Sequence, residues 1–174
     1  MSPSNALNME ATWLPFTPNR HFKTEHPRVV VAAQGIYYTT QEGRQIIDGA
    51  SGLWCSAAGH GRTEIADAIY KQLNTLDYSP AFQFGNPLQF QAAQRIAELC
   101  PGHLNKVFFC NSGSEAVDTT LKMALAYHRA RGEGHRNVFI GRERAYHGVG
   151  FGGMSVGGIP GNRKVFGTSL LPRV

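Results

Sequence analysis

Apolar residues recur along the chain with two different periods, and each period predicts a different kind of element. Over residues 63–76 and 86–99 they recur every three to four positions, which is the spacing of one face of an α-helix. Thr63 is a suitable cap for the first helix, while Asn86 and Pro87 are typical of a cap and a first helical position. We therefore predict two amphipathic helices, each with one face buried in a core.

Shorter apolar runs predict strands in the first part of the chain. Residues 29–32 form one such run, and residues 36–40 and 45–47 flank the sequence Gln-Glu-Gly-Arg. Gly43 stands where a tight hairpin turn requires a positive φ. The pattern therefore predicts a short strand followed by a β-hairpin.

Two further runs have the character of strands that are buried on both faces. Residues 107–110 and 137–140 are mainly apolar at consecutive positions, and a helical pattern over residues 115–131 separates them. Two strands joined through a helix form a βαβ unit, which implies a parallel sheet with a right-handed crossover. Because two parallel strands do not make a complete sheet, we expect the 174 residues to be the front part of a larger α/β protein.

The junction at the start of that helix has the chemistry of an anion site. The first of these strands stops at Asn111, and Ser112 and Glu115 then have the spacing of a capping box, in which each side chain accepts from the other residue's amide. The amides of Gly113 and Ser114 remain free at the positive end of the helix dipole, and the Ser114 hydroxyl adds a donor. The junction therefore predicts a phosphate seat; the alternative is a capped helix with nothing bound.

The segment after the second strand contains a candidate partner for this seat. Tyr146, His147 and Gly148 follow the strand end, where α/β proteins place their ligands. Tyr146 is placed to lay its ring over a flat ligand, with Gly148 leaving room for that ligand; the alternative is an exposed Tyr-His pair. Trp54, in an earlier loop of small residues, either plugs a core or lines a pocket.

Composition and charge narrow the classes of function. The net charge of +5 comes from scattered basic residues, whereas a nucleic-acid binder concentrates them on one face. The three cysteines form no CxxC pair and are expected to be buried free thiols of a reducing compartment. The seven histidines lack ligand spacing, so no metal site is predicted. No apolar run approaches the ~18 residues of a membrane span and no secretory signal pattern opens the chain, so we expect a cytoplasmic protein.

Taken together, the order of these motifs resembles that of a known family, the class III aminotransferases, which are pyridoxal 5′-phosphate (PLP) enzymes of fold type I. The sequence NSGSEA after a strand, followed by YHG at residues 146–148, carries the resemblance at the phosphate seat. The stretches QGIYYTTQEGRQIIDGASGLWCSAAGHG and LDYSPAFQFGNPLQFQAAQRIAEL extend it over most of the chain. Within the family, LDYSPAFQFG and GVGFGGMSVGGIPGNRK are most similar to the ω-amino acid–pyruvate, or β-alanine–pyruvate, aminotransferases.

The resemblance implies a fold and a division of the chain. The fold class is α/β, of the aspartate aminotransferase-like PLP fold type I, in an incomplete form. Residues 1–60 are expected to contribute to the small domain and to the active-site entrance. Residues 61–174 are expected to form the first part of the large PLP-binding domain, which has a mostly parallel sheet.

The resemblance also assigns roles to individual residues. Gly113 and Ser114 would bind the phosphate of PLP, and Tyr146 would stack on its ring. Trp54 would line the substrate pocket, and Phe82 would reach the active site of a partner subunit. In the family, the lysine that carries the cofactor, the aspartate paired with its pyridine nitrogen and the arginine that receives the substrate carboxylate all lie later in the chain. No catalytic residue is therefore expected in this segment.

The activity implied is the transfer of an amino group from an ω-amino acid such as β-alanine to pyruvate, by way of PLP. The family builds its active sites at subunit interfaces, so a homodimer or homotetramer is implied, with neither nucleic acid nor a membrane as partner. One alternative is another class III enzyme, such as a diamine or ornithine-type aminotransferase or an aminomutase. The other is a non-catalytic phosphate-binding module.

Overall fold

The computed structural model describes residues 7–25 and 27–174 of the chain. The chain divides into two compact units, Met1–Phe84 and Gly85–Val174. The boundary that we predict after residue 60 concerns the longer family fold and stays a prediction.

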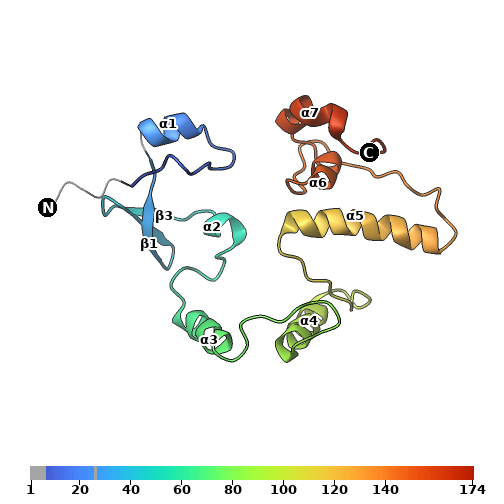
Figure 1. Ribbon diagram of the computed structural model, residues 1–174, viewed down its shortest axis with the longest axis horizontal. Coiled ribbons are helices and arrows are strands. Elements are labelled where there is room, and N and C mark those ends of the chain that lie inside the picture. Colours follow the sequence, from blue (N-terminus) through green and yellow to red (C-terminus); the bar gives the residue numbers. More distant parts are fainter. Residues whose placement is uncertain (1–6, 26) are drawn as a thin grey trace. The chain divides into compact units, whose positions relative to one another are not determined.

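The first unit is built around a small antiparallel sheet (Figure 1). The sheet has the order β1-β2-β3, and Tyr38 in the central strand pairs with Ala33 on one side and with Ile46 on the other. The turn between the second and third strands contains Gly43 with a φ of 80°, so the predicted hairpin is confirmed. The elements of this unit are α1 (Asn19–Thr24), β1 (Val30–Gln34), β2 (Tyr37–Thr40), β3 (Gln45–Ile47), α2 (Ser51–Trp54) and α3 (Thr63–Leu73).

Helix α3 carries the predicted apolar stripe, but within the described residues no element covers it. Ile65 and Ile69 on this stripe are 48% and 55% exposed, so the prediction of a buried face is wrong for these residues. An amphipathic helix buries its stripe only where another element packs on it. The start is also shifted by one residue: Thr63 is the first helical residue, and Arg62 is the N-cap, with no side-chain capping bond.

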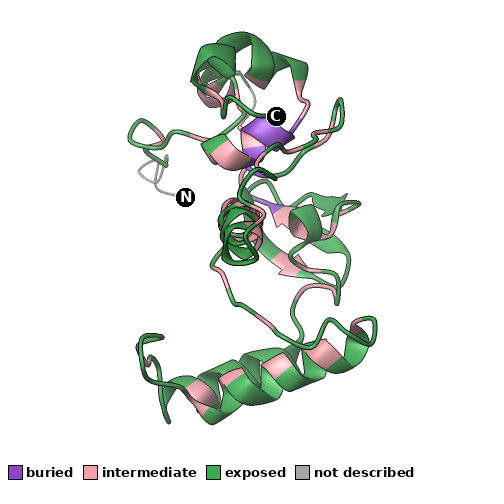
Figure 2. Cartoon of the chain, turned by 90° about the vertical axis from the view of Figure 1, so that its right-hand side faces the viewer, coloured by how far each residue is buried: buried purple, intermediate pink, exposed green. Residues whose placement is uncertain are grey.

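The second unit consists of helices and irregular segments. Its first helix begins as predicted, because the Asn86 side chain accepts from the Gln89 amide at 2.9 Å and Pro87 occupies the first turn. The buried residues gather around the short helix α6, where Ser155 is fully buried and Val156 is 8% exposed (Figure 2). The elements are α4 (Pro87–Leu99), α5 (Gly113–Ala130), α6 (Phe151–Val156), α7 (Pro160–Phe166) and the 3-10 helix η1 (Gly167–Ser169).

The predicted parallel strands over residues 107–110 and 137–140 are absent as hydrogen-bonded strands from the part of the chain that the structure describes. The second segment makes one bond of this kind, from the Phe139 amide to the Arg173 carbonyl oxygen at 2.9 Å. A strand is stabilised by its neighbours in a sheet, and these two segments have no such neighbours here. The prediction of two paired strands is therefore wrong for the described residues, although the two segments still stand before and after α5 in the chain.

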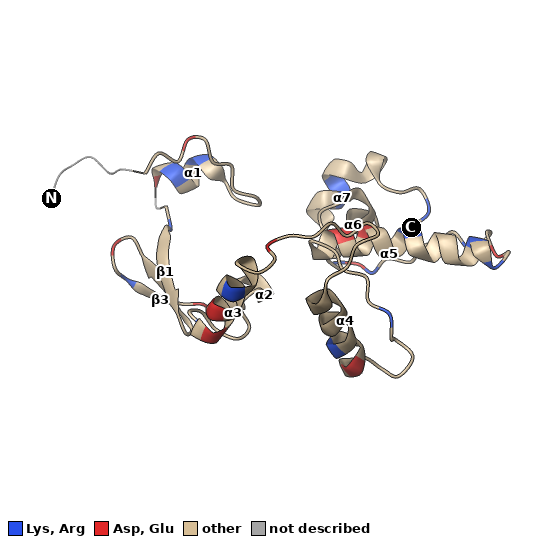
Figure 3. Cartoon of the chain, turned by 60° about the horizontal axis from the view of Figure 1, so that its bottom comes forward, with Lys and Arg blue, Asp and Glu red and all other residues tan. Residues whose placement is uncertain are grey.

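Charged side chains are distributed over both units, as Figure 3 shows for α1, α3, α4 and α7. Among the described helices, none combines the length and the apolar character that crossing a membrane requires.

Candidate active site

The site is built on the start of α5, where the predicted cap forms with one change of partner. The Ser112 side chain accepts from the Glu115 amide at 3.1 Å, as predicted. The Glu115 carboxylate, however, accepts from the amide and the side chain of Asn111, at 2.9 and 3.1 Å, and not from the Ser112 amide. Asn111 offers two donors where Ser112 would offer one amide, which explains the preference. The cap therefore engages the amides of Asn111 and Glu115, and it does not engage the amides of the residues between them.

The amides of Gly113 and Ser114 donate to no acceptor among the described residues. Gly113 is exposed, and a Cβ at this position would have nothing within 4 Å, so a ligand can approach the backbone closely. Both amides lie in the first turn of an 18-residue helix, whose dipole favours a negative charge there. The start of α5 therefore fits a phosphate group.

Ser114 also joins this helix to the segment that contains Tyr146. Its Oγ accepts from the Val149 amide at 3.0 Å, across 35 residues of sequence. The hydroxyl hydrogen is consequently still available to donate to a ligand. Gly148 is buried with a φ of 114°, and a Cβ there would lie 2.7 Å from the Ser114 Cα. The missing side chain of Gly148 thus makes room for Ser114, and its predicted role beside a flat ligand stays a prediction.

Asp118, one turn further along α5, makes a second connection that the sequence analysis missed. Its Oδ1 accepts from the Gly153 amide at 2.8 Å. A Cβ on Gly150 or Gly152 would approach the Asp118 carboxylate to 2.6 or 2.7 Å. The signal that could have found this contact is the run of glycines after Tyr146, since closely spaced glycines indicate a close approach of another element.

Tyr146 lies two residues before Gly148, so the contact of Gly148 with Ser114 brings its segment to the start of α5. Its side chain is half exposed, at 51%, and is therefore accessible to a ligand. The structure thus brings the segment that contains Tyr146 to Ser114, which follows Gly113 at the start of α5. The stacking of the Tyr146 ring on a cofactor stays a prediction.

Trp54, the predicted pocket residue, belongs to the first unit. Its side chain is 78% exposed, so among the described residues it plugs no core. It ends α2, in which Gly52 and Leu53 have left-handed φ and ψ values of 59°, 36° and 59°, 52°. The φ values of Ser51 and Trp54 are also positive, at 50° and 73°. Such a backbone costs roughly 1–2 kcal/mol for each residue that is not glycine, so this turn needs support from its surroundings.

A carboxylate beside this turn, also missed by the sequence analysis, provides such support. Asp48 lies 2.8 Å from the Nε2 of His60, and the two side chains are only 7% and 14% exposed. The hydrogen bond with His60 lowers the pKa of Asp48 below its ordinary value of 3.8; burial opposes this, while the amides of Ala50 and Gly52 add to it. Burial, and then the charge of Asp48, raise the pKa of the neighbouring Tyr38. Asp48 is therefore held as a carboxylate.

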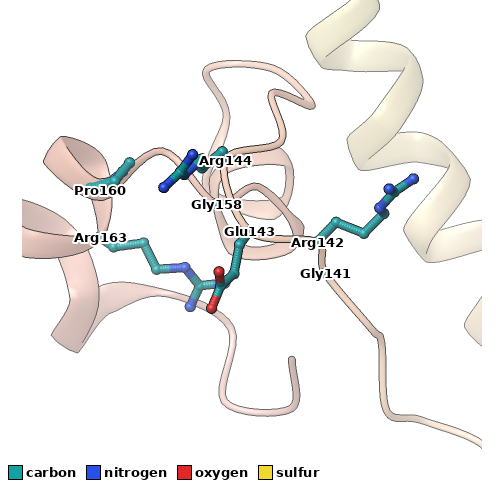
Figure 4. Close-up of a pocket in the computed structure, with 7 residues that line it drawn as sticks. All are labelled: Gly141, Arg142, Glu143, Arg144, Gly158, Pro160 and Arg163. Carbon is teal, nitrogen blue, oxygen red and sulfur yellow. The ribbon is translucent and has the colours of Figure 1, made fainter.

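A pocket of about 500 Å³ lies next to the Tyr146 segment (Figure 4). The guanidinium of Arg163 is engaged by the carbonyl oxygens of Ser155 and Gly157, and Arg142 and Arg144 point in different directions. The basic groups of this pocket therefore do not converge on one ligand position. Its lining consists of Gly141, Arg142, Glu143, Arg144, Gly158, Pro160 and Arg163.

Two predictions about other side chains can be compared with the described residues. Cys55, Cys100 and Cys110 are free, but the first is exposed and the others are half-buried, so the expectation that they are buried is wrong. No group of three or more histidine, cysteine, aspartate or glutamate side chains within residues 7–25 and 27–174 could hold a metal ion.

Comparison with known proteins defines the class to which this fold and site belong. Residues 20–174 match the family described as aminotransferase class III, and the chain therefore belongs to the class III aminotransferases. It is 56% identical to an ω-aminotransferase of Caulobacter vibrioides over 98% of its own length and 38% of that protein's. It is 54% identical to a β-alanine–pyruvate aminotransferase of Pseudomonas aeruginosa, over 94% of this chain and 36% of that one.

Solved structures give the same fold. An (S)-enantioselective ω-transaminase from Thermomicrobium roseum aligns with a TM-score of 0.87 and 34% identity, over 92% of this chain and 36% of that one. A PLP-bound amine transaminase from an uncultivated Pseudomonas species aligns with a TM-score of 0.84 and 34% identity, over 94% and 37% of the two chains. The predicted α/β fold, PLP fold type I, is thus confirmed.

A third structure is a thermostable ω-transaminase variant engineered for the asymmetric synthesis of enantiopure bulky amines. It aligns with a TM-score of 0.88 and 32% identity, over 95% of this chain and 37% of that one, and it carries replacements of a tryptophan, a phenylalanine and an arginine. The chain spans less than two fifths of the length of all these relatives. Most of their sequence therefore has no counterpart in this chain.

Proposed function

We propose that this chain is the part of a PLP-dependent aminotransferase that binds the cofactor phosphate and one side of the substrate, and that the whole enzyme transfers an amino group from an ω-amino acid such as β-alanine to pyruvate. The observation that carries the proposal is the arrangement at the start of α5. There the Gly113 and Ser114 amides are unengaged by other described residues, and the Val149 amide is bonded to Ser114 at 3.0 Å. The names of the relatives at 54% and 56% identity support the substrate class.

Each residue of the site has a distinct task in this proposal. The Gly113 and Ser114 amides and the Ser114 hydroxyl bind the phosphate, and the α5 dipole adds to the attraction. Tyr146 covers the ring of the cofactor and restricts water there. When bound, PLP supplies the electron sink that allows an amino group and a proton to move between donor and acceptor. The residues of this chain bind and orient, and none of them is assigned the proton transfer.

Trp54 lines the substrate pocket in this proposal, and Phe82 contributes from the loop before α4. The support is a matching separation: the tryptophan and phenylalanine replaced in the variant for bulky amines are 28 positions apart, as are Trp54 and Phe82. Both side chains are exposed in the described structure, to 78% for Trp54 and 87% for Phe82. Large aromatic rings at these positions would limit the size of an amino donor.

The proposal extends to assembly and location. A homodimer or homotetramer would allow Phe82 to reach the site of a partner subunit, as the family resemblance implies. Three free cysteines and no disulfide among the described residues favour a reducing compartment, such as the cytoplasm.

The test uses the whole enzyme that contains this chain, purified and loaded with PLP. The cofactor's visible absorbance band should shift when β-alanine is added and return when pyruvate follows. A shift with a diamine but none with β-alanine would overturn the substrate class and leave the cofactor assignment standing. Gly113→Asp should weaken PLP binding, because it places a like charge beside the phosphate seat, while Gly134→Asp, on the loop after α5, serves as the control. Equal PLP affinity of the two variants would overturn the phosphate seat.

A further inference from the structure

Four consecutive residues before Cys55 have a left-handed backbone, and three of them are not glycine. The φ values of Ser51, Gly52, Leu53 and Trp54 are 50°, 59°, 59° and 73°. L-residues visit this region singly and rarely in succession. A strained segment that persists must be held by its surroundings, and such segments are concentrated at functional sites.

The Asp48 carboxylate binds this turn by accepting hydrogen bonds from backbone amides of the turn. Its carboxylate accepts from the Gly52 amide at 2.7 Å through Oδ2, and from the Ala50 amide at 3.2 Å through Oδ1. The turn is closed by the Trp54 amide, which donates to the Ala50 carbonyl oxygen at 2.9 Å. The carboxylate therefore binds the amide just before the segment and the amide of its second residue, and Trp54 is the last residue of the segment.

The carboxylate is itself fixed on the sheet of the first unit. The Asp48 amide donates to the Ile36 carbonyl oxygen at 2.8 Å, and Oδ2 lies 2.8 Å from His60 Nε2. His60 is anchored by two backbone bonds with Gly35, of 3.0 and 2.8 Å, and its ring lies 4.7 Å from that of Tyr38. Asp48 and His60 thus join the turn to the sheet of the first unit and to the residues next to it.

We propose that Asp48, oriented by His60, is a positioning residue that sets the direction of the Trp54 side chain and thereby the size of amino donor that the enzyme accepts. The inference rests on the proposed function, in which Trp54 lines the substrate pocket. It follows from geometry: without the carboxylate, Leu53 and Trp54 would relax toward a right-handed backbone, and the Trp54 side chain would leave its present direction.

The test is a double-mutant cycle in the PLP-loaded enzyme. The variants are Asp48→Asn, Trp54→Ala and the two combined, with Asp67→Asn on the exposed face of α3 as the matched control. The measurement is the ratio of kcat/KM for a bulky arylalkyl amine to kcat/KM for β-alanine. Asp48→Asn should change this ratio about tenfold, the size expected when a hydrogen bond to a charged group is lost. The change should vanish when Trp54 is already alanine.

Additive effects of the two substitutions would overturn the inference, because they would mean that Asp48 acts on the whole unit and not through Trp54. If Trp54→Ala alters the ratio and Asp48→Asn does not, the inference fails while the proposed pocket stands. If Trp54→Ala leaves the ratio unchanged, the pocket assignment itself fails and the inference fails with it. The two failures are therefore distinguishable.

A second measurement covers the case in which Asp48→Asn folds poorly. Hydrogen exchange of the Gly52 amide, followed in the whole enzyme, should become at least about tenfold faster in His60→Gln, which keeps a polar side chain but loosens the carboxylate. The exchange of amides within α3 should stay unchanged. Unaltered exchange at Gly52 would overturn the role of His60 and of the carboxylate that it orients.

Discussion

Gly148 passes so close to Ser114 that a Cβ at position 148 would lie 2.7 Å from the Ser114 Cα and 2.9 Å from its Oγ. The contact places the segment that carries Tyr146 against the first turn of α5, where we propose the phosphate seat. Glycine is favoured at position 148 for two independent reasons, which are this close approach and the φ of 114°.

The first prediction is that Gly148→Ala weakens cofactor binding. The new Cβ would displace Ser114, whose hydroxyl is proposed to bind the phosphate, and the backbone would be strained by about 1–3 kcal/mol. We expect the dissociation constant for PLP to rise on the order of tenfold, as measured by fluorescence titration. Gly134→Ala is the control, because a Cβ there meets nothing within 4 Å. Equal PLP affinity of the two variants would contradict the contact.

The second prediction concerns the other connection between these segments. Asp118→Ala removes the acceptor of the Gly153 amide, and we expect it to lower the free energy of unfolding by about 1–3 kcal/mol, since that amide is left unpaired. Asp118→Asn keeps one carbonyl oxygen and should cost less. Chemical denaturation of both variants checks the order. An Asp118→Ala variant as stable as the parent protein would show that the bond contributes nothing.

Local patterns predicted the elements whose stability is local. The hairpin needs only Gly43 and two flanking apolar runs, and the start of α4 needs only Asn86 and Pro87, and all of these lie close together in the sequence. Residues 107–110 and 137–140 failed as hydrogen-bonded strands for the opposite reason. A parallel strand is defined by neighbours that come from distant sequence, and the described residues contain none for them.

The site shows the same division. The capped helix start with the unengaged amides of Gly113 and Ser114 could be predicted, because a cap and a helix dipole both follow from the sequence within one turn. The pairing of Asp48 with His60, and that of Asp118 with Gly153, join residues far apart in the chain and leave no periodic signal. The positive φ values of Leu53 and Trp54 could not be predicted either, because neither residue type favours them.

The third prediction tests the Ser112 cap at the start of α5, next to the proposed phosphate seat. Ser112→Ala removes the acceptor of the Glu115 amide and should lower the free energy of unfolding by about 0.5–2 kcal/mol. Ser112→Gly lets solvent reach the freed amide and should therefore lower the free energy of unfolding by only a few tenths of a kcal/mol. Thermal and chemical denaturation of the two variants provide the comparison. If Ser112→Gly proved the less stable of the two, the side chain would not be acting as a cap.

The last prediction is a dependence of stability on pH that belongs to Asp48. Its pKa in the folded chain is lowered from 3.8, first by the hydrogen bond with His60, so the unfolded chain takes up this proton before the folded chain does. The stabilisation is therefore fully present above pH 3.8 and is lost as the pH falls through the lower folded value. We expect the difference in melting temperature between the parent protein and Asp48→Asn to shrink as the pH falls below about 4. Asp67→Asn, on the exposed face of α3, is the matched control variant. A difference that did not shrink below pH 4 would contradict the lowered pKa of Asp48, and the Trp54 turn would then have to be stabilised by another group.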